Sequence, residues 1–218
     1  MGYNVAIDGP AGAGKSTIAK LVAKEKGYIY VDTGAMYRGM AIPFLDKGIR
    51  AKETDKIISA LKDAEVTIRY EEGLQQVYLN GRNITDRLRE EEVGKMASLT
   101  SAIPQVRQKL LELQKGLART QDVIMDGRDI GTCVLPDADV KIYLTASVET
   151  RAKRRYDELT EKGIACDLDE IERDIKERDE RDSTREIAPL KQAEDAVLVD
   201  SSHMTIDEVV AAIVKLCR

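Results

Sequence analysis

The sequence has 218 residues, 33% of them charged, with 34 basic and 39 acidic side chains and a net charge of −5. This length is enough for one domain with a substantial core. The negative balance argues against nucleic-acid binding as the main activity. No stretch approaches 18 consecutive apolar residues, so we expect no membrane span. The start of the chain has no signal-peptide pattern, and three widely spaced cysteines fit a reducing compartment, so we expect a cytoplasmic location.

Five short apolar runs predict buried strands at 4–8, 28–32, 123–127, 140–144 and 196–200. Helical patterns separate these runs, and Thr205 fits the N-cap of a final helix. Apolar strands that alternate with helices are typical of a parallel sheet covered on both faces. We therefore expect an α/β fold with a five-stranded parallel sheet and helices on both faces.

The first loop contains the phosphate-binding pattern G-x-x-x-x-G-K-[ST]. In residues 6–17, AIDGPAGAGKST, this pattern is met by Gly9, Gly14, Lys15 and Ser16. Glycines let backbone N–H groups point at phosphate oxygens, and the helix that follows adds its positive N-terminal end. Lys15 is expected to reach the β and γ phosphates and Ser16 to bind Mg²⁺. The alternative is a Gly-rich turn with no ligand, but the strand before it and the helix after it favour a P-loop nucleotide-binding fold.

Two segments interrupt the alternation of strands and helices. Residues 66–85 predict a small antiparallel meander with turns at Glu72-Gly73 and Asn80-Gly81. This meander lies in a larger insertion, 37–105, that also contains helical patterns. In the second segment, 147–185, arginines and acidic residues dominate and apolar residues are sparse. Both segments are interpreted as lobes on a nucleotide-binding core.

Arginines are the side chains that indicate the chemistry. Arg151, Arg154 and Arg155 have the spacing of one helical face. A second set, Arg178, Asp182 and Arg185, shares a face if its helix continues that far. A solvated, salt-bridged helix face is the alternative for such charge runs. However, phosphoryl transfer needs much positive charge around an anionic transition state, and a mobile lobe can supply it on closing.

Two further motifs lie at predicted strand ends. Arg38 follows the second strand in DTGAMYRG, and Arg128 and Asp129 follow the third in MDGRDIG. In an open parallel sheet, ligands bind at these carboxyl ends, so the motifs should converge near the phosphate loop. The alternative for DGRD alone is a simple turn.

Several motifs together resemble those of a known family. The motifs are IDGPAGAGKST, DTGAMYR, SAIPQVR, DGRDIGT, PDADVKIYL, KERDERD and APL, which extend over nearly the whole chain. They resemble the bacterial cytidylate kinases of the nucleoside monophosphate kinase superfamily, and DGRDIGT together with KERDERD is the specific pair. The resemblance implies a monomeric enzyme that uses ATP and Mg²⁺ to phosphorylate CMP and dCMP, without nucleic-acid or membrane partners.

The resemblance also assigns roles to individual positions. ATP phosphates would be held by Gly9, Pro10, Ala11, Gly12, Ala13, Gly14, Lys15, Ser16 and Thr17. The monophosphate would be held by Thr33, Tyr37, Arg38, Ser98, Arg107, Arg128, Asp129, Arg178, Asp182 and Arg185. Catalytic charge would come from Lys15, Arg128, Arg151, Arg154, Arg155 and Arg178, and Mg²⁺ would be bound by Ser16 and, through water, Asp126. Thr33 departs from the serine of many members but keeps the hydroxyl.

The domain division that follows has a core of 1–36, 106–146 and 186–218, a monophosphate-binding insertion at 37–105 and a lid at 147–185. Two other functions remain open at this point. One is a kinase on the same fold that acts on another monophosphate or small metabolite. The other is a non-catalytic sensor that closes around ATP.

Overall fold

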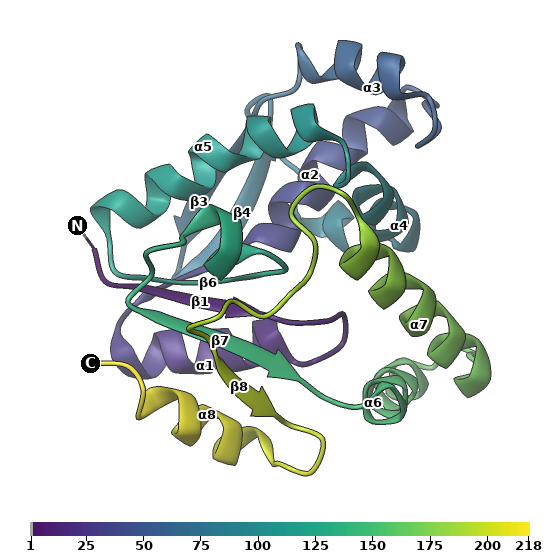
Figure 1. The fold of residues 1–218 in the computed structure, drawn as a ribbon. Helices are drawn as coiled ribbons and strands as arrows, with labels where there is room; N and C mark the ends of the chain where they lie inside the picture. Colours follow the sequence, from purple (N-terminus) through teal and green to yellow (C-terminus); the bar gives the residue numbers. More distant parts are fainter. Residues whose placement is uncertain (1) are drawn as a thin grey trace.

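The main sheet of the protein has five parallel strands, as the sequence predicts. In the computed structural model, which describes residues 2–218, these strands are β1 (Asn4–Asp8), β2 (Ile29–Asp32), β6 (Val123–Gly127), β7 (Val140–Thr145) and β8 (Val197–Asp200). Their order is β2-β6-β1-β7-β8, so β1 lies at the centre and β2 at one edge (Figure 1). All five carboxyl ends therefore meet at one edge of the sheet.

Helices cover both faces of this sheet, and each face has its own apolar cluster. On one face, Ile124 of β6 packs with α1 (Lys15–Lys26) and α8 (Ile206–Val214). On the other, Met125 packs with α2 (Thr33–Asp46) and α5 (Pro104–Thr120). Neighbouring side chains of a strand point to opposite faces, which is why consecutive apolar residues enter different clusters.

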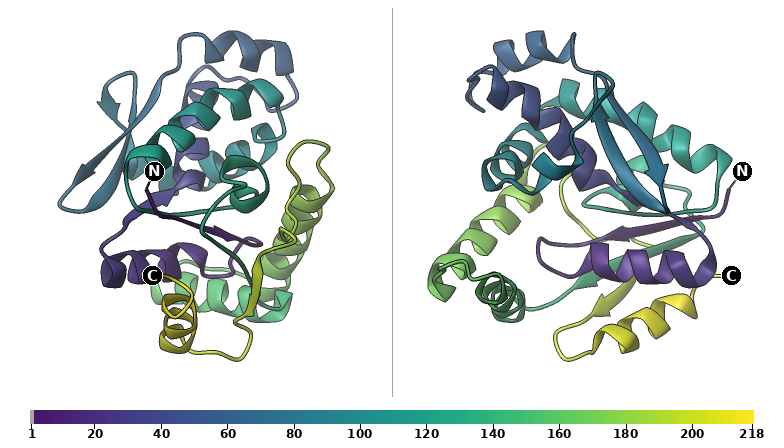
Figure 2. Two further views of the ribbon diagram at one scale, coloured as in Figure 1. Left: turned by 60° about the vertical axis from the view of Figure 1, so that its left-hand side comes forward. Right: turned by 180° about the vertical axis from the view of Figure 1, so that it is seen from behind.

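The predicted meander is present as a three-stranded antiparallel sheet. Its strands are β3 (Val66–Glu71), β4 (Leu74–Leu79) and β5 (Arg82–Asn83), and the β3–β4 hairpin lies beside α2 (Figure 2). Both predicted turns are confirmed, because the φ angles at Asn80 and Gly81 are 48° and 79° and those at Glu72 and Gly73 are 52° and 76°. Such paired positive φ values match the twist of a hairpin.

Three more elements complete the insertion: α3 (Thr54–Leu61), the 3₁₀ helix η1 (Thr85–Arg89) and α4 (Glu91–Thr100). The predicted boundary at 36/37 lies inside α2, and the one at 105/106 lies inside α5. The insertion is therefore joined to the core through continuous helices rather than through linkers, and its division from the core remains a prediction.

The segment predicted as a lid forms two helices that pack on each other beyond the carboxyl ends of the strands. These are α6 (Val148–Glu161) and α7 (Leu168–Thr184) (Figure 1). Helix α6 buries Arg151 and Ala152, and α7 buries Asp182. Few residues of these two helices are thus buried, and the role of this segment as a lid remains a prediction.

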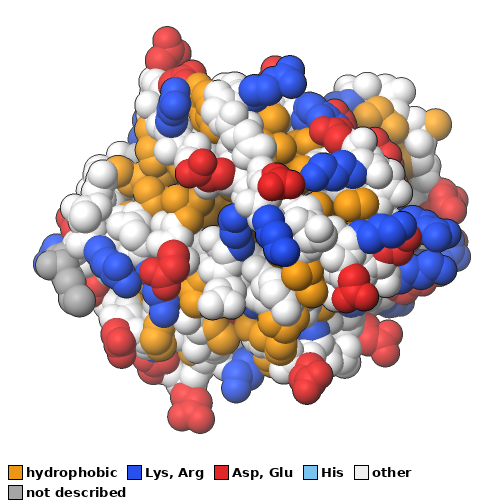
Figure 3. All heavy atoms as spheres, turned by 90° about the horizontal axis from the view of Figure 1, so that it is seen from above, with side chains coloured by type: hydrophobic (Ala, Val, Ile, Leu, Met, Phe, Trp, Pro, Cys, Tyr) orange, Lys and Arg blue, Asp and Glu red, His pale blue; other side chains and the backbone are white. Residues whose placement is uncertain are grey.

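Charges of both signs are distributed over the face of the molecule seen from above, with apolar atoms between them (Figure 3). This pattern agrees with the nearly balanced numbers of basic and acidic residues in the sequence. Among residues 2–218, no helix combines the length and the apolar character that a membrane span needs.

The contact between α2 and the hairpin gives a test of the packing. A Cβ at Gly39 of α2 would lie 2.9 Å from Val77 Cγ1 and 3.3 Å from Ile84 Cδ1. We expect Gly39→Ala to lower the free energy of unfolding by about 1–2 kcal/mol, because overpacking outweighs the gain in helix propensity. A Cβ at Gly116 of α5 meets no atom within 4 Å, so Gly116→Ala should raise it by about 0.5–1 kcal/mol. Urea unfolding of both variants checks this, and equal shifts would contradict the packing.

Candidate active site

The phosphate-binding pattern forms the loop between β1 and α1. Gly9 has a φ of 152°, and a Cβ at this position would lie 1.9 Å from the Leu144 carbonyl oxygen, so only glycine fits. Lys15 is buried, and its Nζ donates to the Pro10 carbonyl at 2.7 Å. The N-cap of α1, Gly14, provides no side-chain hydrogen bond. The first amides of the helix are therefore left for a ligand that accepts hydrogen bonds.

The surroundings of Lys15 disfavour its positive charge. Burial is the main cause that holds the pKa of Lys15 well below its ordinary value, and the nearby Arg128 lowers it further. Asp126 and Asp8 act in the opposite direction. An anion in the loop would remove the imbalance, because it would add the negative charge that this lysine lacks.

Asp126, near the end of β6, is fixed by two hydroxyl groups. Ser16 Oγ donates to its Oδ2 at 2.9 Å, and the Tyr30 hydroxyl donates to its Oδ1 at 3.0 Å. Burial, followed by the charge of Asp32, raises the pKa of Asp126 to about 6. Tyr30 was not predicted from sequence, although it lies two residues before the end of the second predicted strand.

The pair Ser16 and Asp126 fits the predicted magnesium role. Hydroxyl and carboxylate oxygens are ligands that Mg²⁺ prefers, and this ion is usually held by one or two such groups together with substrate phosphates and water. No cluster of three or more His, Cys, Asp or Glu side chains suited to a metal occurs in residues 2–218. The donor set therefore fits an ion that arrives with a nucleotide better than an ion held by the protein alone.

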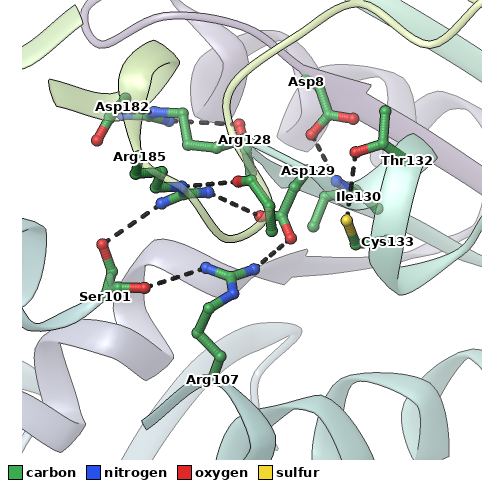
Figure 4. Close-up of polar contacts among 12 residues, drawn as sticks. Asp8, Ser101, Arg107, Arg128, Asp129, Ile130, Thr132, Cys133, Asp182 and Arg185 are labelled. Atoms are coloured by element: carbon green, nitrogen blue, oxygen red, sulfur yellow. Dashed lines mark hydrogen bonds and ion pairs between the residues drawn. The ribbon is translucent and has the colours of Figure 1, made fainter. Parts of the chain in front are cut away.

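The motif DGRD is held in place by Asp8, at the end of β1. The Asp8 carboxylate accepts hydrogen bonds from the backbone of Ile130 and Gly131, both at 2.7 Å (Figure 4). These residues begin η2 (Ile130–Val134), a single π-helical turn. Burial raises the pKa of Asp8 to about 6 in spite of these two bonds. Asp8 was not identified as a site residue from sequence, although it lies at a strand end like the others.

Asp129 is enclosed by arginines from two other elements. Its carboxylate pairs with Arg107 of α5 and, at 3.3 Å, with Arg185, which follows α7 (Figure 4). Both arginines also donate to Ser101, the first to its carbonyl oxygen and the second to its hydroxyl. Burial raises the pKa of Asp129, and the two arginines oppose this shift. Residues 129, 107 and 185, far apart in the chain, are thus brought together.

The other residues predicted to hold the monophosphate lie around the same space. Arg128 Nε donates to Asp182 at 2.9 Å, and the Thr33 hydroxyl donates to the Asp126 carbonyl at 2.7 Å. Arg38 lies 3.9 Å from Asp32. Two other predicted residues contact arginines: Tyr37 lies beneath the Arg107 guanidinium at 5.6 Å, and the Ser98 hydroxyl accepts from Arg181 at 3.0 Å.

Arg178 differs from the other arginines of the site in one atom. Among residues 2–218, Arg178 Nε is one of three buried side-chain atoms without a hydrogen-bond partner. Burial lowers the pKa of Arg178 to about 10; the charges of Arg128, Arg38 and Arg181 contribute, and Asp182 opposes the shift. A buried donor without a partner, on a cation close to other cations, is costly, which indicates an anionic ligand at this point.

The three predicted arginines of α6 have different surroundings. Arg151 is 4% exposed and bonds to the carbonyl groups of Ala146 and Ala11 at 2.9 and 2.8 Å and to Asp179 at 2.6 Å. Arg154 donates to the Ser201 carbonyl at 2.7 Å, and Arg155 pairs with the exposed Glu158. The contacts of Arg151 are all with the protein, so it positions the phosphate loop against α7.

The expected helical face of the second set extends only to Asp182. Helix α7 ends at Thr184, and Arg185 has an extended backbone with φ −61° and ψ 140°. This bend carries Arg185 toward Asp129 and Ser101 rather than along the helix.

One cavity of about 670 Å³ joins these groups. It is lined by all of the predicted site residues except Gly9 and Pro10, which shape the loop from behind. Sequence reasoning missed the segment after β8, which contributes Ser201, Met204, Thr205, Ile206 and Val209. The strand-end rule that located Arg128 also applies to the end of β8 and could have found it.

Comparisons with known proteins agree with this geometry. The cytidylate kinase family matches residues 5–218. A cytidylate kinase of Caldicellulosiruptor saccharolyticus is 51% identical over 213 residues, which is 98% of this chain and 94% of that protein. A cytidylate kinase of Lactobacillus johnsonii is 50% identical over 98% of this chain and 93% of that protein.

A solved structure shares the fold at much lower identity. The shikimate kinase of Bacteroides thetaiotaomicron superposes with a TM-score of 0.50 at 13% identity, covering 98% of this chain and 97% of that one. Because the family match and the two relatives extend over nearly the whole chain, this protein belongs to the cytidylate kinase family.

Proposed function

We propose that the protein transfers the γ-phosphoryl group of ATP to CMP and dCMP, producing CDP and dCDP. The observation that carries this proposal is the single cavity in which the phosphate loop faces a second set of cationic and polar groups, including Arg38, Arg128 and Asp129. The phosphoryl donor and the phosphoryl acceptor can therefore bind side by side in this cavity. Family membership supplies the identity of the acceptor.

On the donor side, residues 9–17 would surround the phosphates of ATP. The amides at the start of α1 would donate to phosphate oxygens, and Lys15 would neutralise charge on the β and γ phosphates. Ser16 and Asp126 would hold Mg²⁺, directly and through water. When bound, this ion neutralises charge on the phosphate oxygens.

On the acceptor side, the monophosphate would lie between α2 and the loop after β6. Thr33, Tyr37, Arg38 and Arg128 would surround its phosphate. The base would meet Asp129, which can accept from the amino group of cytosine as carboxylates do in nucleic acids. Arg107 and Ser98 would donate to the ring nitrogen and the 2-carbonyl, and Arg178, Asp182 and Arg185 would contact sugar and phosphate.

The transfer needs no general base, because the attacking phosphate oxygen is already anionic. Catalysis then consists of alignment and charge stabilisation. Lys15, Arg128 and Arg178 already lie near one another, because both arginines lower the pKa of Lys15 and Arg128 lowers that of Arg178. Arg154 and Arg155 on α6 would add charge as the lid closes and water is excluded. Arg151 would act differently, by holding Ala11 of the loop.

The remaining parts of the proposal concern the setting of the enzyme. We expect a monomer that works in the cytoplasm, where all three cysteines would stay reduced as they are here. The insertion 37–105 would bind the monophosphate, and residues 147–185 would form the lid on the core of 1–36, 106–146 and 186–218.

The test of this function is ADP release measured with ATP and a panel of nucleoside monophosphates and small metabolites. We expect CMP and dCMP to be the preferred acceptors. ADP release that depends on a different acceptor would indicate another kinase of the same fold. Nucleotide binding with no acceptor-dependent ADP would indicate a sensor, and either result would contradict the proposal.

The unsatisfied Nε atom of Arg178 predicts opposite effects of one substitution on activity and stability. Arg178→Met should lower kcat by about 10²–10³, because one charge contact to the transferred group is lost. The same variant should unfold at an equal or higher temperature without ligands, because it removes a buried donor without a partner and a charge that neighbouring arginines repel. Steady-state kinetics and thermal unfolding measure both, and a folded variant with normal kcat would exclude the role.

The base-reading role of Asp129 is tested by a ratio of two substrates. Asp129→Ala should lower kcat/KM for CMP and change that for UMP little, which reduces the preference for CMP by about 1–3 kcal/mol. If Asp129 only holds Arg107 and Arg185 in place, kcat/KM should fall by the same factor for CMP and for UMP. An unchanged ratio of kcat/KM for CMP to kcat/KM for UMP would therefore contradict the base-reading role.

A further inference from the structure

The edge strand β2 is completed by side chains of the insertion instead of another strand. In the main sheet β2 pairs with β6, and Ile29 N–H donates to the Asp122 carbonyl across that pair. Because backbone groups alternate in direction along a strand, those of Tyr30 and Asp32 point to the opposite, outer side. The β3–β4 hairpin supplies their partners there. The Tyr70 hydroxyl donates to the Tyr30 carbonyl at 3.1 Å.

The side-chain amide of Gln75, on β4, bonds to the backbone of Asp32 through both its oxygen and its nitrogen. Its Oε1 accepts from Asp32 N–H at 2.9 Å, and its Nε2 donates to the Asp32 carbonyl at 3.1 Å. One side chain thus makes the two bonds that a neighbouring strand would make. Each bond keeps a part-buried backbone group satisfied, which makes the contact specific for an amide of this length.

Asp32 is the last residue of β2 and the N-cap of α2. Its Oδ1 accepts from the Ala35 N–H at 2.8 Å, and its other oxygen faces Arg38 at 3.9 Å. The next residue, Thr33, is buried and bonded to the Asp126 carbonyl. The Asp32 backbone that Gln75 binds therefore fixes the position of the first turn of α2, the helix whose Tyr37 and Arg38 line the cavity.

The phosphate loop has anchors that do not involve Gln75. Lys15 donates to the Pro10 carbonyl, and Arg151 donates to the Ala11 carbonyl. A substitution of Gln75 should thus disturb the position of the first turn of α2 more than that of the phosphate loop.

We propose that Gln75 is a positioning residue through which the insertion sets the affinity for the monophosphate. The proposal rests on the proposed function, because it assigns α2 to the monophosphate side. The amide of Gln75 acts through Asp32, and without it the first turn of α2 is free to shift away from the acceptor. The insertion then contributes to the site even though β4 itself is outside the cavity.

The test compares Gln75 with its neighbour on the opposite face of β4. Gln76 makes one side-chain contact, to Asn83 at 3.3 Å, so Gln76→Ala is a matched control. Gln75→Ala should raise KM for CMP about fivefold to tenfold, the loss of about one net hydrogen bond, and leave KM for ATP within about twofold. Gln75→Met, which keeps the length but neither bond, should behave like Gln75→Ala.

Hydrogen exchange gives a readout that does not depend on activity. The amide of Ala35 should exchange faster in Gln75→Ala than in Gln76→Ala, while the amides of α1 exchange alike. Equal KM values for CMP in the two variants would overturn the proposal. Parallel losses for CMP and ATP would also overturn it, because they indicate general destabilisation. A wild-type enzyme that does not use CMP would instead overturn the proposed function, and the wild-type assay reveals this before any variant is compared.

Discussion

The repulsion among closely placed cations is the constraint on which the rest of the site depends. Arg128 and Arg178 lower the pKa of the buried Lys15, and Arg128 also lowers that of Arg178; burial is the larger cause of both shifts. Carboxylates offset part of this charge, because Asp126 acts on Lys15, and Asp182 acts on Arg178 and pairs with Arg128. The Nε atom of Arg178 still lacks a hydrogen-bond partner, and an anionic substrate would balance the charge there. Substrate binding and relief of repulsion are then the same event.

The carboxylates that offset this charge also determine geometry. Asp8 holds the loop of Arg128 and Asp129 by its backbone, and Asp182 joins that loop to α7. Arg151 joins α7 to the phosphate loop through Asp179 and Ala11. Helices α6 and α7 are thereby connected to both sides of the cavity by ion pairs and a hydrogen bond. Such contacts would suit the lid that we propose for residues 147–185, which would have to open for each turnover.

The insertion joins the site in a different way, through the edge of the sheet. Gln75 and Tyr70 satisfy backbone groups of β2 that would otherwise face solvent or remain unpaired. On the other side, Gly39 lets α2 approach Val77 closely. The hairpin therefore contacts α2 at its N-terminal end and along its flank. This explains how a lobe with its own small sheet can influence residues at the carboxyl edge of the larger one.

The sequence by itself determined the local features and the kind of chemistry. The five strands, the phosphate loop, the two tight turns and the N-cap at Thr205 depend on periodicity, glycine placement and capping within a few residues, and each is present. The convergence of strand-end motifs followed from parallel strands alone. Its resemblance to a family then identified 21 of the 34 residues that line the cavity, and it included Arg38 and Asp129.

Only the tertiary structure decided which partner each charged group has. Arg151, Arg154 and Arg155 share one helical face, yet the first contacts the phosphate loop, the second contacts Ser201 and the third pairs with Glu158. The hydrogen bond between Asp8 and Ile130 joins residues 122 positions apart in the sequence, and the one between Gln75 and Asp32 joins residues 43 positions apart. Such pairs leave no periodic signal, because they depend on strand order and on how α6, α7 and the hairpin pack. Spacing along a chain specifies the face of an element, whereas the partner of that face exists only after the elements have assembled.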